Sequence, residues 1–151
     1  MAENRHEEYR KKILEIGEAL GYKVRRSFSR HSRGDAVWID PRSLKFSKKG
    51  LPVVAFEILT FELYREIKDC IMNLQSISPA LGALVVIEDE YATKSEKLVR
   101  YDRESYPEHI KKVAGSLSER VSLSFRIEVW DQKTIDDLYL KYVEGRLRLV
   151  G

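Results

Sequence analysis

The predictions of fold and site for this chain depend most on the stretch GDAVWIDPRSLKFSKKGLPVVAFEILTF, residues 34–61. It contains two short apolar runs, residues 36–39 and 53–59. Asp35 opens the first run, and Glu57 lies inside the second. A carboxylate in an apolar strand must be paired, hydrogen-bonded or bound to a metal, because burying it alone is costly. Two such acids on neighbouring strands can share one cation, so Asp35 and Glu57 predict a metal site.

The segments that flank the two acids are basic. Residues 41–52 are bounded by prolines and carry four cations around Phe46, which predicts a basic hairpin or loop between two strands. Upstream, residues 22–31 alternate in the manner of a strand, with Tyr22, Val24 and Phe28 on one side. The other side of this strand carries basic and hydroxyl side chains, which suit binding to phosphates.

The rest of the chain alternates between helical and strand periodicity. Helical patterns cover residues 5–20, 62–77 and 134–146, and a further helical segment begins near residue 93 and is renewed at Pro107. Gly21 is expected to end the first helix. Strands are predicted at 35–40, 52–60, 81–87 and 121–130, the last with Trp130 facing outward. The resulting order α-β-β-β-α-β-α-β-α predicts an α/β fold with a single mixed central sheet flanked by helices. Short connections favour an antiparallel start, and the helix at 62–77 favours a parallel crossover.

Length and composition indicate one globular domain over residues 1–151. Charged residues make up 34% and hydrophobic residues 43% of the chain, without an apolar run long enough to span a bilayer. Cys70 is the only cysteine, which excludes an internal disulfide and fits a reducing compartment. We therefore expect a cytoplasmic protein that does not bind membranes. Scarce Asn and Gln beside abundant Lys, Arg and Glu resemble the composition of a thermophile.

The charge is unevenly distributed, although the net charge is only +3. Residues 1–50 hold 13 Lys or Arg against 7 Asp or Glu, whereas the remainder holds 14 against 17. Such asymmetry suits a polyanionic partner, and an ordinary solvated face is the alternative explanation.

The element order, together with an acid opening the second strand and another late in the third, resembles the PD-(D/E)XK nuclease-like superfamily. Archaeal Holliday-junction resolvases are the members that the chain most resembles. The resemblance implies a restriction-endonuclease-like fold, a homodimer, and single-stranded or branched DNA as partner. It also implies that Asp35, Glu57 and the backbone carbonyl of Ile58 bind Mg²⁺ or Mn²⁺. Ser27, Arg30 and the acids Glu7 or Glu8 correspond to supporting polar groups.

The chain departs from this pattern at Leu59, where the superfamily places a lysine two residues after the glutamate. That lysine orients the attacking water and stabilises developing negative charge. By analogy with deleting one preorganised donor, its loss costs on the order of 10²–10³ in rate. Lys68 or Arg65 on the following helix is a candidate replacement, and an ordinary solvated helix lysine is the alternative for Lys68.

Three hypotheses therefore stay open: a metal-dependent DNA endonuclease, a single-stranded DNA-binding protein that does not cleave, and a protein-interaction module. The second is supported by similarity in size and composition to archaeal proteins of the ThermoDBP type, and by abundant aromatic residues that suit stacking in a basic groove. The predicted catalytic set is Asp35, Glu57 and Lys68. The predicted nucleic-acid-binding set is Arg25, Arg26, Ser29, Arg30, Arg33, Lys45, Lys48, Lys49 and Trp130.

Overall fold

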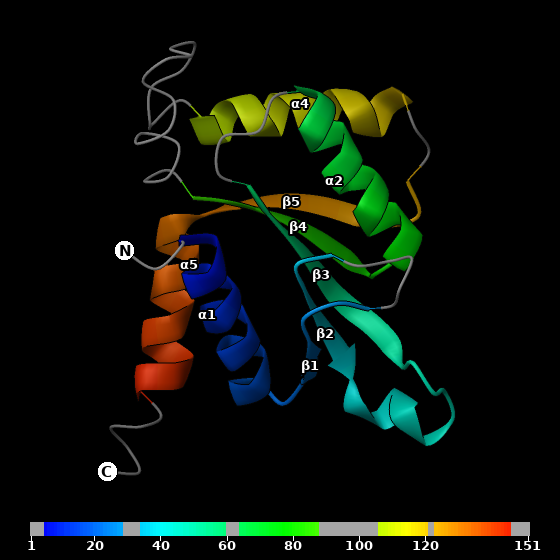
Figure 1. Cartoon of the computed structure of the whole chain (residues 1–151), viewed down its shortest axis with the longest axis vertical. Helices are drawn as coiled ribbons and strands as arrows, with labels where there is room; N and C mark the ends of the chain where they lie inside the picture. Colours follow the sequence, from blue (N-terminus) through cyan, green and yellow to red (C-terminus); the bar gives the residue numbers. More distant parts are fainter. Residues whose placement is uncertain (1–4, 29–33, 60–63, 88–105, 121–122, 146–151) are drawn as a thin grey trace.

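A computed structural model of the chain describes residues 5–28, 34–59, 64–87, 106–120 and 123–145 (Figure 1). Five strands in this part of the chain form one sheet in the order β1-β2-β3-β4-β5. The strands are β1 (Lys23–Arg25), β2 (Ala36–Asp40), β3 (Leu51–Leu59), β4 (Leu81–Val86) and β5 (Arg126–Asp131). The helices are α1 (Arg5–Ala19), α2 (Tyr64–Ile77), α4 (Tyr106–Arg120) and α5 (Gln132–Tyr139). The predicted α/β class and the predicted order of elements are confirmed.

The sheet is mixed because short connections join the first three strands, whereas long connections with helices join β3 to β4 and β4 to β5. β1, β2 and β3 pair in antiparallel fashion, whereas β4 runs parallel to both β3 and β5. The antiparallel start and the parallel crossover through α2 are therefore as expected. β3 is the middle strand, and its last six residues, which include Glu57, are all buried.

The helices form two layers, one on each face of the sheet (Figure 1). Helices α1 and α5 pack on one face, and α2 and α4 cover the other. Alternate residues of the strands supply the two cores, as the two-residue period of a strand requires. The first core contains Ile13, Ile16, Trp38, Phe56 and Ile135, and the second contains Val37, Leu59, Ile71, Leu84 and Ile110.

Helix α1 is fixed against the sheet by close packing on Trp38. The indole Nε1 of Trp38 donates to the carbonyl oxygen of Ile13 at 3.0 Å, and the ring lies directly beneath Gly17. The helix ends as predicted at Gly21, whose N–H bonds the Glu18 carbonyl while the next N–H bonds the Gly17 carbonyl. The docking of α1 therefore follows from one aromatic side chain and one small helix position.

Three local predictions need correction. The strand expected over 22–31 is only three residues long, and Phe28 packs in the α2 and α4 core rather than beside Tyr22 and Val24. The connection expected as a hairpin or loop begins with a 3-10 helix, η1 (Pro41–Lys45), because Asp40 caps its start and Pro41 suits its first position. The last helix is shorter than expected, and a π-helical turn, η3 (Leu140–Glu144), follows it.

Several predictions concern residues that the structure does not describe: the helix start near residue 93, the first residues of the helix expected at 62, and parts of the strands expected at 22–31 and 121–130. In the part of the chain that is described, no helix is both long and apolar enough to cross a membrane.

Candidate active site

Asp35 and Glu57 lie side by side where β2 begins and β3 ends. The N–H of Asp35 donates to the carbonyl oxygen of Phe56 at 2.8 Å, which aligns the two strands at this point. The Asp35 carboxylate then turns over β3 and accepts the N–H of Ile58 at 2.7 Å. This places it within hydrogen-bonding reach of the Glu57 carboxyl. The expected adjacency of the two acids is confirmed.

The environment of Glu57 favours its protonated form. Burial, followed by the negative charge of Asp35 and the hydrogen bond between the two carboxyls, raises the pKa of Glu57 to about 9. Hydrogen bonds from Asn73 and Cys70 on α2 oppose this shift without cancelling it. Only 6% of Glu57 is exposed, so solvent does little to stabilise its charge. At neutral pH the pair therefore holds one proton.

Asp35 shifts in the opposite direction. Burial raises its pKa, but the His6 hydrogen bond, the Ile58 N–H and the charge of His6 together hold that pKa below its usual range. Asp35 is therefore the ionised member of the pair, and Glu57 donates a hydrogen bond to it. Two carboxyls whose environments separate their pKa values in this way are typical of functional sites.

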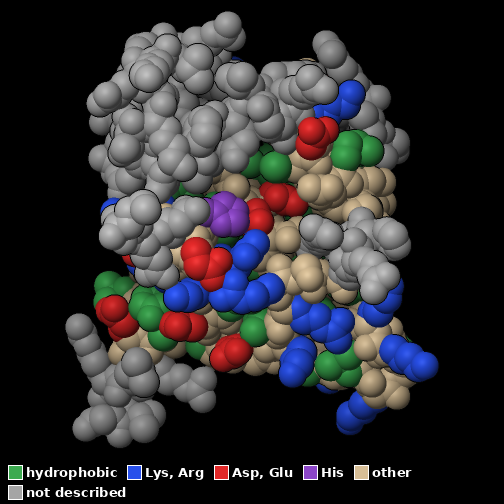
Figure 2. Space-filling view, in the orientation of Figure 1, with side chains coloured by type: hydrophobic (Ala, Val, Ile, Leu, Met, Phe, Trp, Pro, Cys, Tyr) green, Lys and Arg blue, Asp and Glu red, His purple; other side chains and the backbone are tan. Residues whose placement is uncertain are grey.

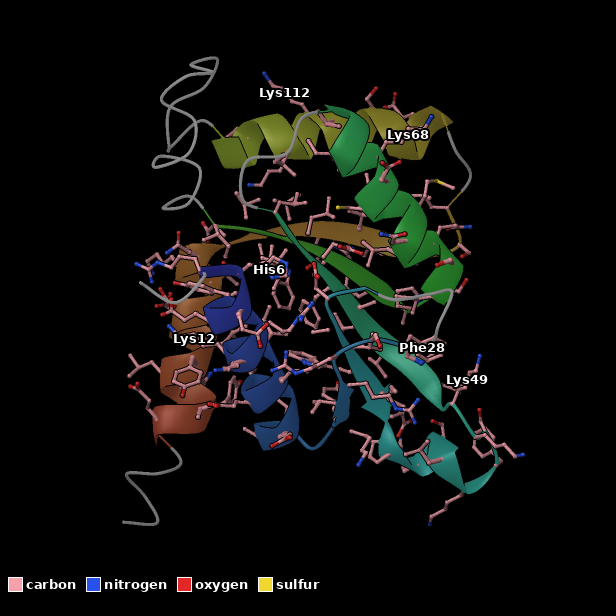
Figure 3. All side chains as sticks on the ribbon, viewed as in Figure 1. His6, Lys12, Phe28, Lys49, Lys68 and Lys112 are labelled. Carbon is pink, nitrogen blue, oxygen red and sulfur yellow. The ribbon has the colours of Figure 1, made fainter. Side chains whose placement is uncertain are left out.

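Helix α1 brings two basic side chains to this pair. His6 Nε2 lies 3.3 Å and Arg10 Nη2 lies 3.1 Å from the same oxygen, Oδ1 of Asp35. His6 and Arg10 are four residues apart and so occupy the same side of the helix. Figure 3 shows His6 at the N-terminal end of α1, on the side facing the sheet.

A chain of charges continues from Arg10 toward the surface. Arg10 Nη1 contacts Glu7 at 3.3 Å, and Glu7 also binds the exposed side chain of Arg26. The hydrogen bond from Arg26 is the largest cause of a lowered pKa at Glu7. Arg10 Nε is enclosed and has no hydrogen-bond partner among the described residues. Glu7 therefore links Arg10, beside Asp35, to Arg26 at the surface.

Sequence reasoning did not include His6 or Arg10 in the site. A usable signal was present, because His6 lies three residues before Tyr9 and Arg10 lies three residues before Ile13, and both Tyr9 and Ile13 belong to the apolar stripe of α1. Residues at that spacing border the buried face of the helix and thus approach the edge of the sheet.

The donor set is compatible with a hard divalent cation. Asp35 and Glu57 supply carboxylate oxygens, and the Ile58 carbonyl points to the same side as its N–H, which already contacts Asp35. Oxygen ligands of this kind suit Mg²⁺ or Mn²⁺. Among the described residues, no group of three or more His, Cys, Asp or Glu is arranged to hold a metal. The fit thus depends on two carboxylates and one backbone carbonyl.

Lys68, one of the two expected replacements for the missing lysine, is not brought to the pair, and the side chain of Arg65 lies outside the described part of the structure. Leu59 is fully buried in the core beneath α2 and α4. Lys68 is exposed, and it lies on the side of α2 away from Cys70 and Asn73, which approach Glu57. Figure 3 likewise shows Lys68 well separated from His6. Within the described residues, the guanidinium that reaches Asp35 is that of Arg10, from a different helix.

The predicted nucleic-acid-binding residues divide into three groups. Lys45, Lys48 and Lys49 are exposed on the connection between β2 and β3, where Figure 2 shows Lys and Arg side chains gathered on one part of the surface. Arg25 is half-buried, and Arg26 is engaged by Glu7. Ser29, Arg30 and Arg33 lie outside the described residues.

The expectation for Trp130 is wrong. Its ring is half-buried and packs edge-on against Trp38 and Phe56, at centroid distances of 6.5 and 5.4 Å. Its indole N–H donates to Glu128 at 3.1 Å. The face of β5 that alternation placed outward is covered by α1 and α5, so Trp130 belongs to the core and does not offer a stacking surface.

Comparison with known proteins adds no family to this description. No protein-family model matches the chain, and no curated protein matches it either.

Proposed function

We propose that this protein binds DNA and cleaves its phosphodiester backbone at the Asp35–Glu57 pair, as a PD-(D/E)XK-like nuclease. One observation carries the proposal: the buried carboxyl of Glu57 is hydrogen-bonded to the half-buried carboxylate of Asp35, and Arg10 reaches Asp35 from helix α1. A basic connection on the same molecule supplies positive charge for the DNA backbone (Figure 2).

Asp35, Glu57 and the Ile58 carbonyl would hold Mg²⁺ or Mn²⁺ in this proposal. The bound cation would lower the pKa of a coordinated water and neutralise charge on the scissile phosphate. The proton on Glu57 has to leave before Glu57 binds a cation as a carboxylate. Metal binding is therefore coupled to proton release at this residue.

Arg10 takes the part of the lysine that is absent at Leu59. Its guanidinium is permanently charged and already orients Asp35 through Nη2. A phosphate oxygen at the pair would meet the same guanidinium, which can donate to two oxygens at once. The Glu7 contact restricts the rotamers of Arg10 and so reduces the entropy lost when a phosphate binds.

Binding without cleavage is the second candidate. It is favoured by Leu59, which leaves no cation on β3 beside Glu57, and by the outward direction of Lys68. In this case the basic surface would hold DNA while the acid pair keeps its proton and serves only to stabilise the end of the sheet.

The two candidates are separated by a cleavage assay with labelled single-stranded, duplex and branched DNA in the presence of Mg²⁺ or Mn²⁺. Asp35→Asn and Glu57→Gln should abolish cleavage while retaining DNA binding. Glu108→Gln, at an exposed acid on α4, is the matched control and should cleave like the wild type. Cleavage that survives at Asp35→Asn or Glu57→Gln refutes the metal-site assignment. Salt-sensitive binding without cleavage by the wild type supports the second candidate, and absence of binding at low salt refutes both.

We also propose that the protein acts in the cytoplasm. Its single thiol, Cys70, forms no disulfide, is half-buried and hydrogen-bonds Glu57, which is compatible with a reducing compartment.

A further inference from the structure

Phe46 is the most exposed large hydrophobic side chain among the described residues, with 76% of its surface accessible. It follows directly after η1, on the connection between β2 and β3. An exposed aromatic ring does not gain the favourable free energy of burial in the folded protein. A ring as exposed as that of Phe46 is therefore a candidate for binding a ligand. The notable feature is that the backbone beneath this ring is firmly held.

The connection is fixed by Ser43, which is 1% exposed. Its hydroxyl donates to the Asp40 carbonyl at 2.6 Å and accepts the N–H of Leu51 at 2.8 Å, joining the end of β2 to the start of β3. The Ser43 carbonyl accepts the N–H groups of Phe46 and Ser47 at 3.1 and 2.9 Å. The backbone of Phe46 is thus tied to a buried residue while its ring extends into solvent.

Gly50 closes the connection in a conformation that only glycine adopts readily. Its φ is +79°, and a Cβ at this position would collide with Ile39 and approach Leu44 to 3.0 Å. The return of the chain into β3 is therefore specified by the sequence. A binding group on such a preorganised loop loses little conformational entropy when it engages a ligand.

Three lysines surround the ring. Lys45, Lys48 and Lys49 are exposed, and none has an ion-pair partner in the described part of the chain. Arg42 is also exposed but is paired with Asp40 at 3.2 Å. Figure 2 shows Lys and Arg side chains gathered on this part of the surface, and Figure 3 shows Lys49 where the connection returns to β3. One bare aromatic ring among these lysines matches a ligand that has both flat apolar surfaces and closely spaced negative charges.

We propose that Phe46 is a stacking platform for an unpaired base, and that Lys45, Lys48 and Lys49 hold the phosphates beside it. This inference rests on the proposed function and narrows the partner to nucleic acid with single-stranded residues. A base within a duplex has both faces covered by its neighbours, whereas an unpaired base offers a free face to an aromatic ring. A single ring buries little apolar area and is therefore a weak anchor for a membrane. This favours nucleic acid as the partner.

The geometry relates this platform to the acid pair. Leu51 and Glu57 are six residues apart on β3, which corresponds to about 20 Å at the rise of a strand. A stacked nucleic-acid strand advances about 3.4 Å per nucleotide, so this distance corresponds to about six nucleotides. An oligonucleotide that spans β3 from the connection to the acid pair would therefore be about that long.

The test is fluorescence anisotropy with a labelled oligo-dT of about twelve nucleotides and a duplex of equal length, in EDTA to prevent cleavage. Phe46→Ala should weaken single-strand binding by about 5- to 100-fold with little change for the duplex. Phe46→Trp should retain affinity, and its added fluorescence should be quenched on binding. Leu140→Ala, which removes a half-exposed side chain elsewhere, is the matched control and should bind like the wild type.

Salt dependence separates the ring from the lysines. Phe46→Ala should leave the slope of log affinity against log salt unchanged, because the ring displaces no counterions. Lys48→Gln combined with Lys49→Gln should reduce that slope by about 0.7 for each phosphate that the variant no longer neutralises. An unchanged slope in the double variant would refute the role of these lysines.

The outcomes distinguish this inference from the proposed function. If the wild type binds DNA and Phe46→Ala binds single strands equally well, only the stacking inference is refuted. An equal loss of duplex affinity refutes the requirement for an unpaired base. If the wild type binds no nucleic acid, the proposed function is itself refuted. Phe46-dependent binding to vesicles containing about one-third phosphatidylserine, without binding to DNA, would assign the ring to membranes and overturn the inference.

Discussion

The carboxyl groups of Asp35 and Glu57 are hydrogen-bonded to each other at the end of the central sheet, with Asp35 ionised and Glu57 protonated. The difference arises from their surroundings: Asp35 faces His6, Arg10 and the Ile58 N–H, whereas Glu57 faces the interior beneath α2. Two carboxylates within hydrogen-bonding contact would repel each other strongly, and the proton on Glu57 removes that repulsion. The same arrangement determines how the protein should respond to pH, metal ions and substitution.

The free energy of unfolding of the wild type should fall as the pH rises, and Glu57→Gln should remove this fall. Glu57 keeps its proton in the folded protein up to a pKa of about 9, whereas an unfolded glutamic acid loses it near 4.5. Between these values the folded state binds more protons, so the free energy of unfolding falls by about 1.4 kcal/mol per pH unit from this residue. Asp35, with a lowered pKa, is ionised in both states over this range and adds no slope.

Urea unfolding of the wild type and Glu57→Gln at pH 5.5, 7.0 and 8.5 measures this difference. Glutamine mimics the protonated acid and can still donate to Asp35, so the variant should gain stability relative to the wild type at each step. Glu108→Gln serves as the control at an exposed acid. Parallel curves for the wild type and Glu57→Gln would show that Glu57 is not protonated in the folded state.

Mg²⁺ or Mn²⁺ should stabilise the wild type and release protons on binding. A cation that binds only the folded state adds about 2.7 kcal/mol at one hundred times its dissociation constant. Because Glu57 must lose its proton first, binding should tighten as the pH rises toward 9. Thermal unfolding and a pH-indicator titration measure the two effects, and Glu57→Gln should show neither. A proton release that persists in Glu57→Gln would place the metal elsewhere.

The pattern of side chains in the sequence was sufficient to predict the sheet and the meeting of the two acids. Continuous and alternating apolar runs distinguish strands from helices, and short connections require antiparallel neighbours. Asp35 and Glu57 therefore followed from local information. His6 and Arg10 did not, because their approach to Asp35 depends on how α1 docks on Trp38, more than twenty residues away.

Trp130 illustrates a second limit of sequence patterns. Strict alternation divides a strand into two faces, but it does not say whether a helix covers the second face. Helices α1 and α5 cover it here, so Trp130 joins Trp38 and Phe56 in the core. Conversely, Phe46 is a residue type common in cores, and its 76% exposure in the folded structure shows that its ring is directed outward from a backbone held by Ser43.

Arg10→Ala should slow DNA cleavage by about 10²- to 10³-fold if Arg10 replaces the missing lysine. Arg10→Lys should recover part of the rate, since a lysine restores the charge without the planar fork. Single-turnover rates at saturating metal measure the effect, and circular dichroism verifies folding. Arg5→Ala is the matched control, because Arg5 lies on the same helix and pairs with Glu8 instead. An Arg10→Ala rate within twofold of the wild type would exclude Arg10 from the reaction.

Gly17→Ala should destabilise the protein, whereas Gly115→Ala should stabilise it. Both glycines lie within helices, where alanine is intrinsically favoured by about 1 kcal/mol. A Cβ at Gly115 would meet nothing within 4 Å, so that gain should be realised. A Cβ at Gly17 would overlap the Trp38 ring and Val24, and such overpacking costs about 1–3 kcal/mol. Urea unfolding measures both changes.

The Gly17 result also bears on the candidate active site. Displacing α1 from Trp38 would move Arg10, seven residues earlier on the same helix, away from Asp35. We therefore expect Gly17→Ala to reduce cleavage more than its loss of stability explains, with Gly115→Ala as the reference. A Gly17→Ala protein with normal stability and normal cleavage would mean that α1 is not positioned by Trp38, and that contacts of its first turn alone hold Arg10 at the acids.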